Sequence, residues 1–200
     1  MEEKQTSIIY KISKIISDFF NPLVSLVIFF FYMSVKTYSL HASLLYFLPI
    51  LLIIILPVIT WIVWNVKTGR YTNMDVSNRK QRISLYFFIA ACVLVYIGFD
   101  YFKKGHVDLI MLFILILLLT MQLSNYYIKS SMHTAFNIFV AALFFALDTT
   151  LGIAWLGIAV LVGITRVVVG RHTPKEVFMG AGIAFMVSFV YLYCNIQFQS

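Results

Sequence analysis

Seven long apolar runs dominate this sequence of 200 residues. A bilayer core about 30 Å thick is crossed by roughly 20 helical residues, and the runs approach that length. Hydrophobic residues make up 62% of the chain and charged residues 12%, whereas soluble domains average about 45–50% and about 25%. A water-soluble fold of this size cannot hide so much apolar surface, so the runs indicate membrane spans. They cover residues 19–35, 41–64, 83–101, 107–125, 133–147, 151–169 and 177–196.

The fold predicted from this pattern is all-α, a polytopic transmembrane helix bundle of six or seven spans. The aromatic content of 17% fits helices in lipid with interfacial aromatic belts. The composition excludes a disordered chain and a disulfide scaffold, and the unbroken runs exclude a porin-type barrel. Only residues 148–150 separate the fifth and sixth runs, which predicts a tight helical hairpin. Asn21-Pro22 opens the first run and leaves a re-entrant or surface helix as the alternative to a seventh span.

The remaining predictions concern the N-terminal segment, the number of domains and the cysteines. Residues 1–18 carry charges of both signs, and we expect a polar, interfacial N-terminal segment that is retained and not cleaved as a signal peptide. Residues 19–200 are expected to form a single membrane-embedded helix bundle. The two cysteines have no metal-ligand spacing, and a disulfide between them is not expected.

The basic residues gather on one side of this predicted topology. That side holds 12 of the 15 Lys and Arg residues, and the net charge is +7. One interpretation is the positive-inside rule, which makes this side cytoplasmic. The other is an anion site, and a partner that carries phosphate fits the charge. Nucleic acid does not, because no soluble basic domain is present to grip it. The twelve are Lys4, Lys11, Lys14, Lys67, Arg70, Arg79, Lys80, Arg82, Lys129, Arg166, Arg171 and Lys175.

The most informative stretch, residues 165–176, closes the sixth run and opens the seventh. Arg166, Arg171 and His172 lie at this membrane boundary, where polar clusters that face a bundle interior are functional by default. A helix N-terminus beside two arginines suits a phosphate group. A Thr-x-x-Glu capping box, with proline at the first helical position, accounts on structural grounds alone for Thr173, Pro174 and Glu176.

A second polar stretch, residues 129–134, stands at the start of the fifth run. A serine here can cap the helix and leave its first N–H groups free for an anion. His133 would then lie in the first turn. The alternative is an interfacial histidine beside an ordinary cap.

A third stretch, residues 75–82, carries Asp75, Arg79 and Arg82. If it is helical, the three side chains share one face. The alternative is a basic loop with an Asp–Arg pair worth a few tenths of a kcal/mol.

The first of these stretches resembles the third signature of the type 2 phosphatidic acid phosphatase superfamily, SRxxxxxHxxxD. Here the pattern reads Thr165-Arg166, five residues, His172, three residues and Glu176. Threonine for serine keeps the hydroxyl, and glutamate for aspartate keeps the carboxylate. The resemblance therefore extends over twelve residues with the spacing intact.

The second stretch is similar to a degenerate form of the family's PSGH signature, in which Ser131 and His133 are kept. The family's first signature, KxxxxxxRP, has no counterpart. Arg79, Arg82, Lys80 and Lys129 are therefore candidates for phosphate binding by their location only.

The resemblance implies an integral-membrane, metal-independent lipid phosphate or diphosphate phosphatase that acts through a phosphohistidine intermediate. It implies that His172 is the nucleophile, that Glu176 orients its ring, and that His133 protonates the leaving group and then activates water. No cofactor and no metal is implied. The residues expected to bind phosphate are Arg166, Arg171, Ser131, Arg79, Arg82 and Lys129.

The local geometry of the histidine leaves two alternatives. In a regular helix, His172 and Glu176 share one face at i, i+4 spacing. If His172 precedes the helix, as the capping box suggests, Glu176 has to serve either the cap or His172.

Two other functions stay open. One is a phosphotransferase on the same scaffold. The other is a non-catalytic lipid-binding or transport protein, because Met132 stands where the family has glycine and backbone approaches phosphate. The expected partners are a lipid phosphate substrate and membrane lipids. The expected location is a bacterial inner membrane, with the motifs on the cytoplasmic face.

Overall fold

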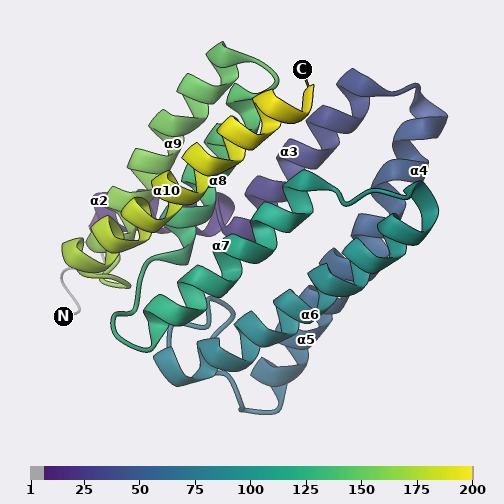
Figure 1. Ribbon diagram of the computed structural model, residues 1–200. Coiled ribbons are helices and arrows are strands. Elements are labelled where there is room, and N and C mark those ends of the chain that lie inside the picture. The colour runs from purple at the N-terminus through teal and green to yellow at the C-terminus, as the bar shows by residue number, and fades with distance from the viewer. Residues whose placement is uncertain (1–6, 200) are drawn as a thin grey trace. The chain divides into compact units, whose positions relative to one another are not determined.

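The computed structural model describes residues 7–199, and these residues are almost entirely helical (Figure 1). No strand occurs among them, which confirms the all-α class. Residues 1–6 of the predicted N-terminal segment lie outside the described residues. The elements are α2 (Ile8–Phe19), α3 (Pro22–Thr37), α4 (Leu40–Ile50), the π-helical turn η1 (Leu51–Ile55), α5 (Leu56–Lys67), α6 (Arg79–Lys104), α7 (Leu109–Asn125), α8 (Met132–Phe145), α9 (Thr149–Val168) and α10 (Pro174–Gln199).

Several of these helices are long and apolar enough to cross a membrane. Four have the length and the apolar composition of a membrane span: the continuous helix His41–Lys67, α6, α9 and residues Pro174–Gln197 of α10. The pair α2 and α3, bent by 53° at its break, is a fifth candidate, while α7 and α8 are shorter apolar helices. These helices support the interpretation of the chain as a membrane protein. The predicted total of six or seven spans stays a prediction.

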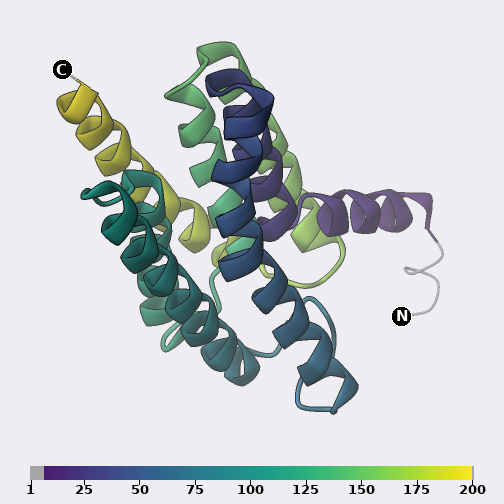
Figure 2. The same cartoon turned by 90° about the vertical axis from the view of Figure 1, so that its right-hand side faces the viewer.

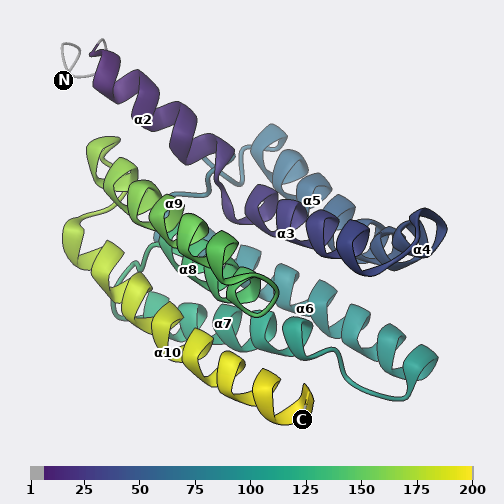
Figure 3. The ribbon, with the colours of Figure 1, turned by 90° about the horizontal axis from the view of Figure 1, so that it is seen from above.

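The chain forms two compact units, and the first comprises residues 1–29 and 128–200. Its central element is α8, in which every side chain from His133 to Phe144 is buried. A helix that is hydrophobic all round belongs in the middle of a bundle. Its largest contacts are with α9 and α10, which lie beside it (Figure 3). Helix α2 packs against α9 in the same unit.

The hairpin predicted between the fifth and sixth runs is α8 followed by α9. Asp148 caps α9: its side chain accepts hydrogen bonds from the backbone N–H groups of Thr150 and Leu151, at 2.9 and 3.2 Å. Gly152 lies against the ring of Phe145, since an added Cβ would meet Phe145 Cγ at 2.4 Å. The cap and the missing side chain together allow the tight turn.

The second unit comprises residues 30–127. Helix α6 packs against η1, α5 and α7 within it. Pro49 lies inside α4 and Pro57 lies near the start of α5, on either side of η1. Proline removes a backbone N–H from the helical ladder, and local π-helical turns accommodate such defects. The second apolar run is therefore one continuous helix with a widened turn.

Candidate active site

The side chains of His172 and Glu176 are in direct contact at the turn between α9 and α10. His172 Nδ1 lies 2.9 Å from Glu176 Oε2. The His172 side chain is fully buried, while that of Glu176 is 18% exposed. When Glu176 is ionised, its carboxylate oxygen accepts a hydrogen bond from Nδ1–H, and in the neutral imidazole this tautomer has its lone pair on Nε2. The contact orients the imidazole ring of His172.

The capping box predicted at the start of α10 is present. Helix α10 begins at Pro174, so His172 precedes the helix. The backbone N–H of Thr173 donates to Glu176 Oε2 at 3.1 Å, and the N–H of Glu176 donates to Thr173 Oγ1 at 3.3 Å. The expectation that Glu176 serves either the cap or the histidine is wrong. One carboxylate oxygen has more than one lone-pair direction, and Oε2 serves both.

Arg166 lies in the last turn of α9, and its contacts in the protein interior stabilise the turn between α9 and α10. Its side chain is only 1% exposed. Its Nη1 donates to Ser17 Oγ of α2 at 2.9 Å. Its backbone oxygen accepts the N–H groups of Arg171 and His172, at 3.0 and 3.2 Å. The left-handed conformation of Gly170 (φ 73°) allows the chain to turn back in this way. The arginine backbone therefore fixes the histidine that follows it.

The start of α8 lies against the first turns of α10. The backbone N–H of Ser131 donates to the backbone oxygen of Glu176 at 3.0 Å. Ser131 is the N-cap of α8, as predicted, and its Oγ accepts from the N–H of Thr134 at 3.4 Å. A Cβ added to Gly180 would lie 2.6 Å from the Ser131 backbone oxygen, which shows how closely the helices approach. His133 lies in the first turn of α8 and is buried.

A further contact joins these segments. Lys129 Nζ donates to the backbone oxygen of Arg171 at 3.0 Å. The first unit thus brings seven of the nine predicted site residues onto neighbouring segments. They are His133, His172, Glu176, Arg166, Arg171, Ser131 and Lys129.

The other two predicted site residues, Arg79 and Arg82, belong to the second unit. The guanidinium of Arg79 donates to the backbone oxygens of Asn125 and Tyr126. Arg82 is buried, and its Nε donates to the Val76 backbone oxygen at 3.1 Å. These contacts hold the loop before α6 and the end of α7. A role in phosphate binding stays a prediction for both arginines.

The third polar stretch is not helical throughout. Helix α6 begins at Arg79, after the N-cap Asn78, whose side chain accepts from the N–H of Lys80 at 2.9 Å. Asp75 lies before the helix, so the shared helical face considered for Asp75, Arg79 and Arg82 does not form. The helix therefore starts at the Asn78 cap, and Asp75 lies in the turn that precedes it.

Asn137 is a buried polar residue that the sequence analysis missed. It lies one turn after His133, and its Nδ2 donates to the backbone oxygen of His133 at 2.8 Å. All four hydrogen-bonding positions of the amide are used. The signal in the sequence is a single amide within an apolar helix. The other partners are the Phe20 backbone oxygen at 2.8 Å, Ser25 Oγ at 3.0 Å and Trp155 Nε1 at 3.2 Å.

Ser17 is the second missed residue, because the first eighteen residues were expected to be only an interfacial segment. Ser13 and Ser17 are the buried residues of α2. Two serines four residues apart, on a different side of the helix from its isoleucines and its lysines, are the available signal, since they mark a face that packs against protein.

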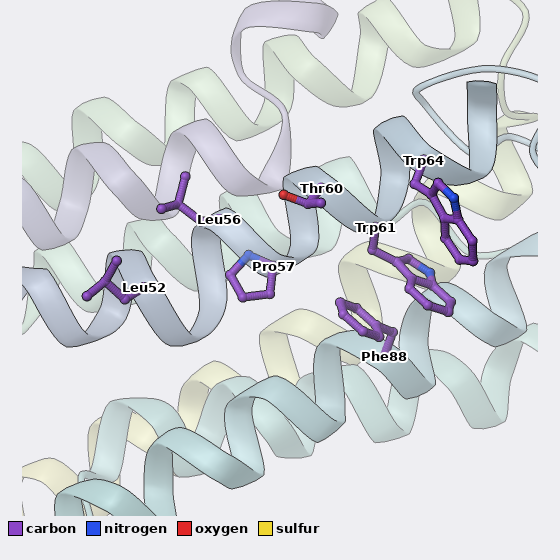
Figure 4. A pocket seen from close by; sticks show the side chains of 7 residues that line it. All are labelled: Leu52, Leu56, Pro57, Thr60, Trp61, Trp64 and Phe88. Carbon is purple, nitrogen blue, oxygen red and sulfur yellow. The ribbon is translucent and has the colours of Figure 1, made fainter. Parts of the chain in front are cut away.

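The second unit carries an apolar pocket (Figure 4). The ring of Trp61 stacks on that of Phe88, with centroids 4.3 Å apart and planes 7° from parallel. Its indole Nε1 donates to Tyr71 Oη at 3.0 Å. The lining includes no titratable side chain, so the pocket offers no acid or base. The lining residues are Leu52, Leu56, Pro57, Thr60, Trp61, Trp64 and Phe88.

Comparison with known proteins gives no match: no protein-family model, no curated protein and no solved structure matches the chain. Within residues 7–199, no group of three or more His, Cys, Asp or Glu side chains is placed to hold a metal ion. The contacts around His172 are therefore the observations from which a function can be proposed.

Proposed function

We propose that this chain is an integral-membrane, metal-independent phosphatase of lipid phosphates or diphosphates, similar to the type 2 phosphatidic acid phosphatase superfamily. The observation that carries the proposal is the contact between His172 Nδ1 and Glu176 Oε2 at 2.9 Å. A histidine whose second nitrogen is held by a carboxylate is an activated nucleophile. The spacing of Arg166, His172 and Glu176 and the neighbouring start of α8 support the same assignment.

The first step transfers the phosphoryl group to the protein. The lone pair of His172 Nε2 attacks the terminal phosphorus. The bond that breaks joins this phosphorus to the lipid oxygen of a monophosphate or to the bridging oxygen of a diphosphate. His133 gives its proton to that leaving oxygen. The products are phosphohistidine and either a lipid alcohol or, from a diphosphate, a lipid monophosphate. Glu176 stabilises the positive charge that forms on the imidazole ring.

The second step returns the enzyme to its starting state. His133, now neutral, takes a proton from water as the water oxygen attacks phosphorus. The bond between phosphorus and His172 Nε2 breaks, and inorganic phosphate leaves. The start of α8 is hydrogen-bonded to the first turn of α10, and this supports roles for His133 and His172 in one reaction.

Negative charge on the phosphoryl oxygens requires nearby donors. Arg166 and Arg171 flank the turn that carries His172, and Lys129 is hydrogen-bonded to the Arg171 backbone oxygen. The first-turn N–H groups of α8, next to Ser131, add a partial positive charge. We assign phosphate binding to these groups of the first unit; phosphate binding by Arg79 and Arg82 stays a separate prediction.

The membrane setting selects the substrate class. The helices that carry the site include two candidate spans, α9 and α10. A phosphate group on an acyl or prenyl chain can enter such a bundle from the lipid. The proposed substrates are therefore phosphorylated lipids, and the proposed location is a bacterial inner membrane with the site on the cytoplasmic face.

The test is phosphate release by detergent-purified protein across a panel of lipid phosphates and diphosphates, with a chelator present. We expect release that survives chelation and is lost in His172→Ala. Release that requires added metal, or that persists in His172→Ala, overturns the proposal. Loss of the lipid phosphate only when an alcohol acceptor is added, with the phosphoryl group recovered on that alcohol and not as inorganic phosphate, reassigns the chain to the phosphotransferases. Lipid binding without any turnover reassigns it to non-catalytic lipid-binding proteins.

A further inference from the structure

Helix α2 has its apolar side facing away from the protein. Ile8, Ile9 and Ile15 are 73%, 68% and 68% exposed. The buried residues of the helix are instead Ser13 and Ser17. In a water-soluble protein this arrangement would be inverted, because it leaves the isoleucines in water and buries hydroxyls. Lipid is the partner that makes the arrangement favourable, since an amphipathic helix buries such a face in the headgroup region.

The direction of α2 fits a helix that lies along the membrane surface. The chain bends by 53° between α2 and α3. In Figure 2, α2 (purple, at the right) lies horizontally while α8 and α9 (green) run upward, and in Figure 3 α2 and α9 run in a similar direction, so α2 is inclined to α9. Because α9 is a candidate span, a helix inclined to its direction lies closer to the membrane plane. Lys11 and Lys14 are exposed on α2, where they can contact anionic headgroups.

The protein-facing side of α2 reaches the candidate active site. Ser17 is 1% exposed, and its Oγ accepts a hydrogen bond of 2.9 Å from Arg166 Nη1. The backbone oxygen of Arg166 accepts the N–H of His172. A hydrogen bond to a charged group in a buried site fixes the position of that group more firmly than a neutral one does. The helix with the lipid-facing isoleucines therefore also holds the arginine beside the proposed nucleophile.

We propose that α2 is an interfacial helix bound to the membrane surface, and that Ser17 is a positioning residue that sets the guanidinium of Arg166 for phosphate. The same helix then binds the membrane and sets the geometry of the site. The placement of α2 in the membrane stands independently of the enzymatic activity. The role of Ser17 rests on the proposed function.

The membrane placement is tested by fluorescence quenching in vesicles. A cysteine introduced as Ile12→Cys, in a Cys92→Ala/Cys194→Ser background, carries an environment-sensitive dye, and Lys14→Cys provides the control on another side of α2. Lipids brominated at different depths serve as quenchers. We expect the dye at position 12 to be quenched most by bromines near the headgroup end of the acyl chains, and more than the dye at position 14. Absence of quenching at position 12, or strongest quenching from the bilayer centre, overturns the placement. The second result would make α2 the first half of a broken span.

The positioning role is tested with orthovanadate, an inorganic mimic of the pentavalent phosphate, as an inhibitor of lipid phosphate hydrolysis. We expect Ser17→Ala to weaken vanadate inhibition about tenfold, the size expected when one hydrogen bond to a charged group is lost. Ser17→Thr should restore it. Ser13→Ala is the matched control, because Ser13 is also buried on α2 and Arg166 donates to Ser17.

A simple loss of stability would change the melting temperature of both alanine variants while leaving vanadate inhibition unchanged, and that result overturns the positioning role. If the wild-type protein hydrolyses no lipid phosphate and binds no vanadate, the proposed function fails and the role of Ser17 fails with it. The quenching experiment decides the placement of α2 in either case.

Discussion

A single carboxylate oxygen joins helix capping to the proposed chemistry. Glu176 Oε2 accepts from the Thr173 backbone N–H and contacts His172 Nδ1. The two contacts require different properties of the side chain. The cap needs only an acceptor, which glutamine also provides. The histidine needs a negative charge that stabilises its cationic form. Substitutions at position 176 can therefore separate folding from catalysis.

We expect Glu176→Gln to lower kcat by a factor of about 10² to 10⁴, the usual worth of a positioned acid–base partner, with little change in melting temperature. Glu176→Ala should lose the same activity and also about 1 kcal/mol of stability, because the cap is lost as well. Steady-state kinetics and thermal unfolding in detergent measure the two effects. Equal melting temperatures for the two variants would contradict the capping role.

Asn137 provides a second test at the residue scale. Its amide makes four hydrogen bonds in the interior of the first unit. We expect Asn137→Ala to cost at least 1–3 kcal/mol, because buried partners lose their bonds. Ser25→Ala removes one of the four and should cost less. Unfolding midpoints in detergent check the order, and an Asn137→Ala variant as stable as wild type would exclude this role.

The site residues show what sequence can and cannot predict. Residues 172–176 are close together in the sequence, so spacing rules predict both the cap and the histidine–carboxylate pair. The contact between Arg166 and Ser17 joins residues 149 positions apart. No local rule encodes such a contact, because it depends on how α2 packs on α9.

At the scale of elements, hydropathy predicts the helices well because lipid demands long apolar stretches. The hairpin of α8 and α9 followed from its short turn, and the structure confirms it. The π-helical turn η1 was not predicted, because its residues, Leu51–Ile55, are as apolar as their neighbours. The start of α6 at Arg79 depends on the cap at Asn78.

The contact between α8 and α10 depends on the absence of a side chain at Gly180. A Cβ there would lie 2.6 Å from the Ser131 backbone oxygen, whereas a Cβ at Gly182 would meet nothing within 4 Å. We expect Gly180→Ala to push the helices apart, to cost about 1–3 kcal/mol and to reduce phosphate release. Gly182→Ala is the control, since alanine favours a helix over glycine. Equal behaviour of the two variants in melting and activity measurements would refute this explanation.

At the scale of the whole molecule, the charge distribution predicts orientation. In the predicted topology, twelve of the 15 basic residues lie on the side that carries the motifs, and the positive-inside rule then predicts the cytoplasmic face for that side. We expect a cysteine introduced as Ser77→Cys to resist membrane-impermeant thiol reagents in intact cells and to react after permeabilisation, with wild type as the control for Cys92 and Cys194. Labelling of residue 77 from outside would place the basic side on the opposite face.

The basic residues of the second unit are tested at the same scale. If Arg79 and Arg82 bind phosphate, Arg79→Gln and Arg82→Gln should raise KM for a lipid phosphate about tenfold or more, because bonds between charged groups are lost. If their role is only to hold the loop and the end of α7, the melting temperature falls while KM is retained in the protein that stays folded. Kinetics and thermal unfolding measured together distinguish the two roles.

The central claim is a covalent phosphoryl group on His172, and rapid acid-free quenching of a reaction with ³²P-labelled lipid phosphate tests it most directly. We predict label on the protein that is stable in alkali, lost in acid, and absent from His172→Ala. Mapping should place it in the peptide that contains His172. Turnover of the lipid without such label, or the same label in His172→Ala, would contradict the claim.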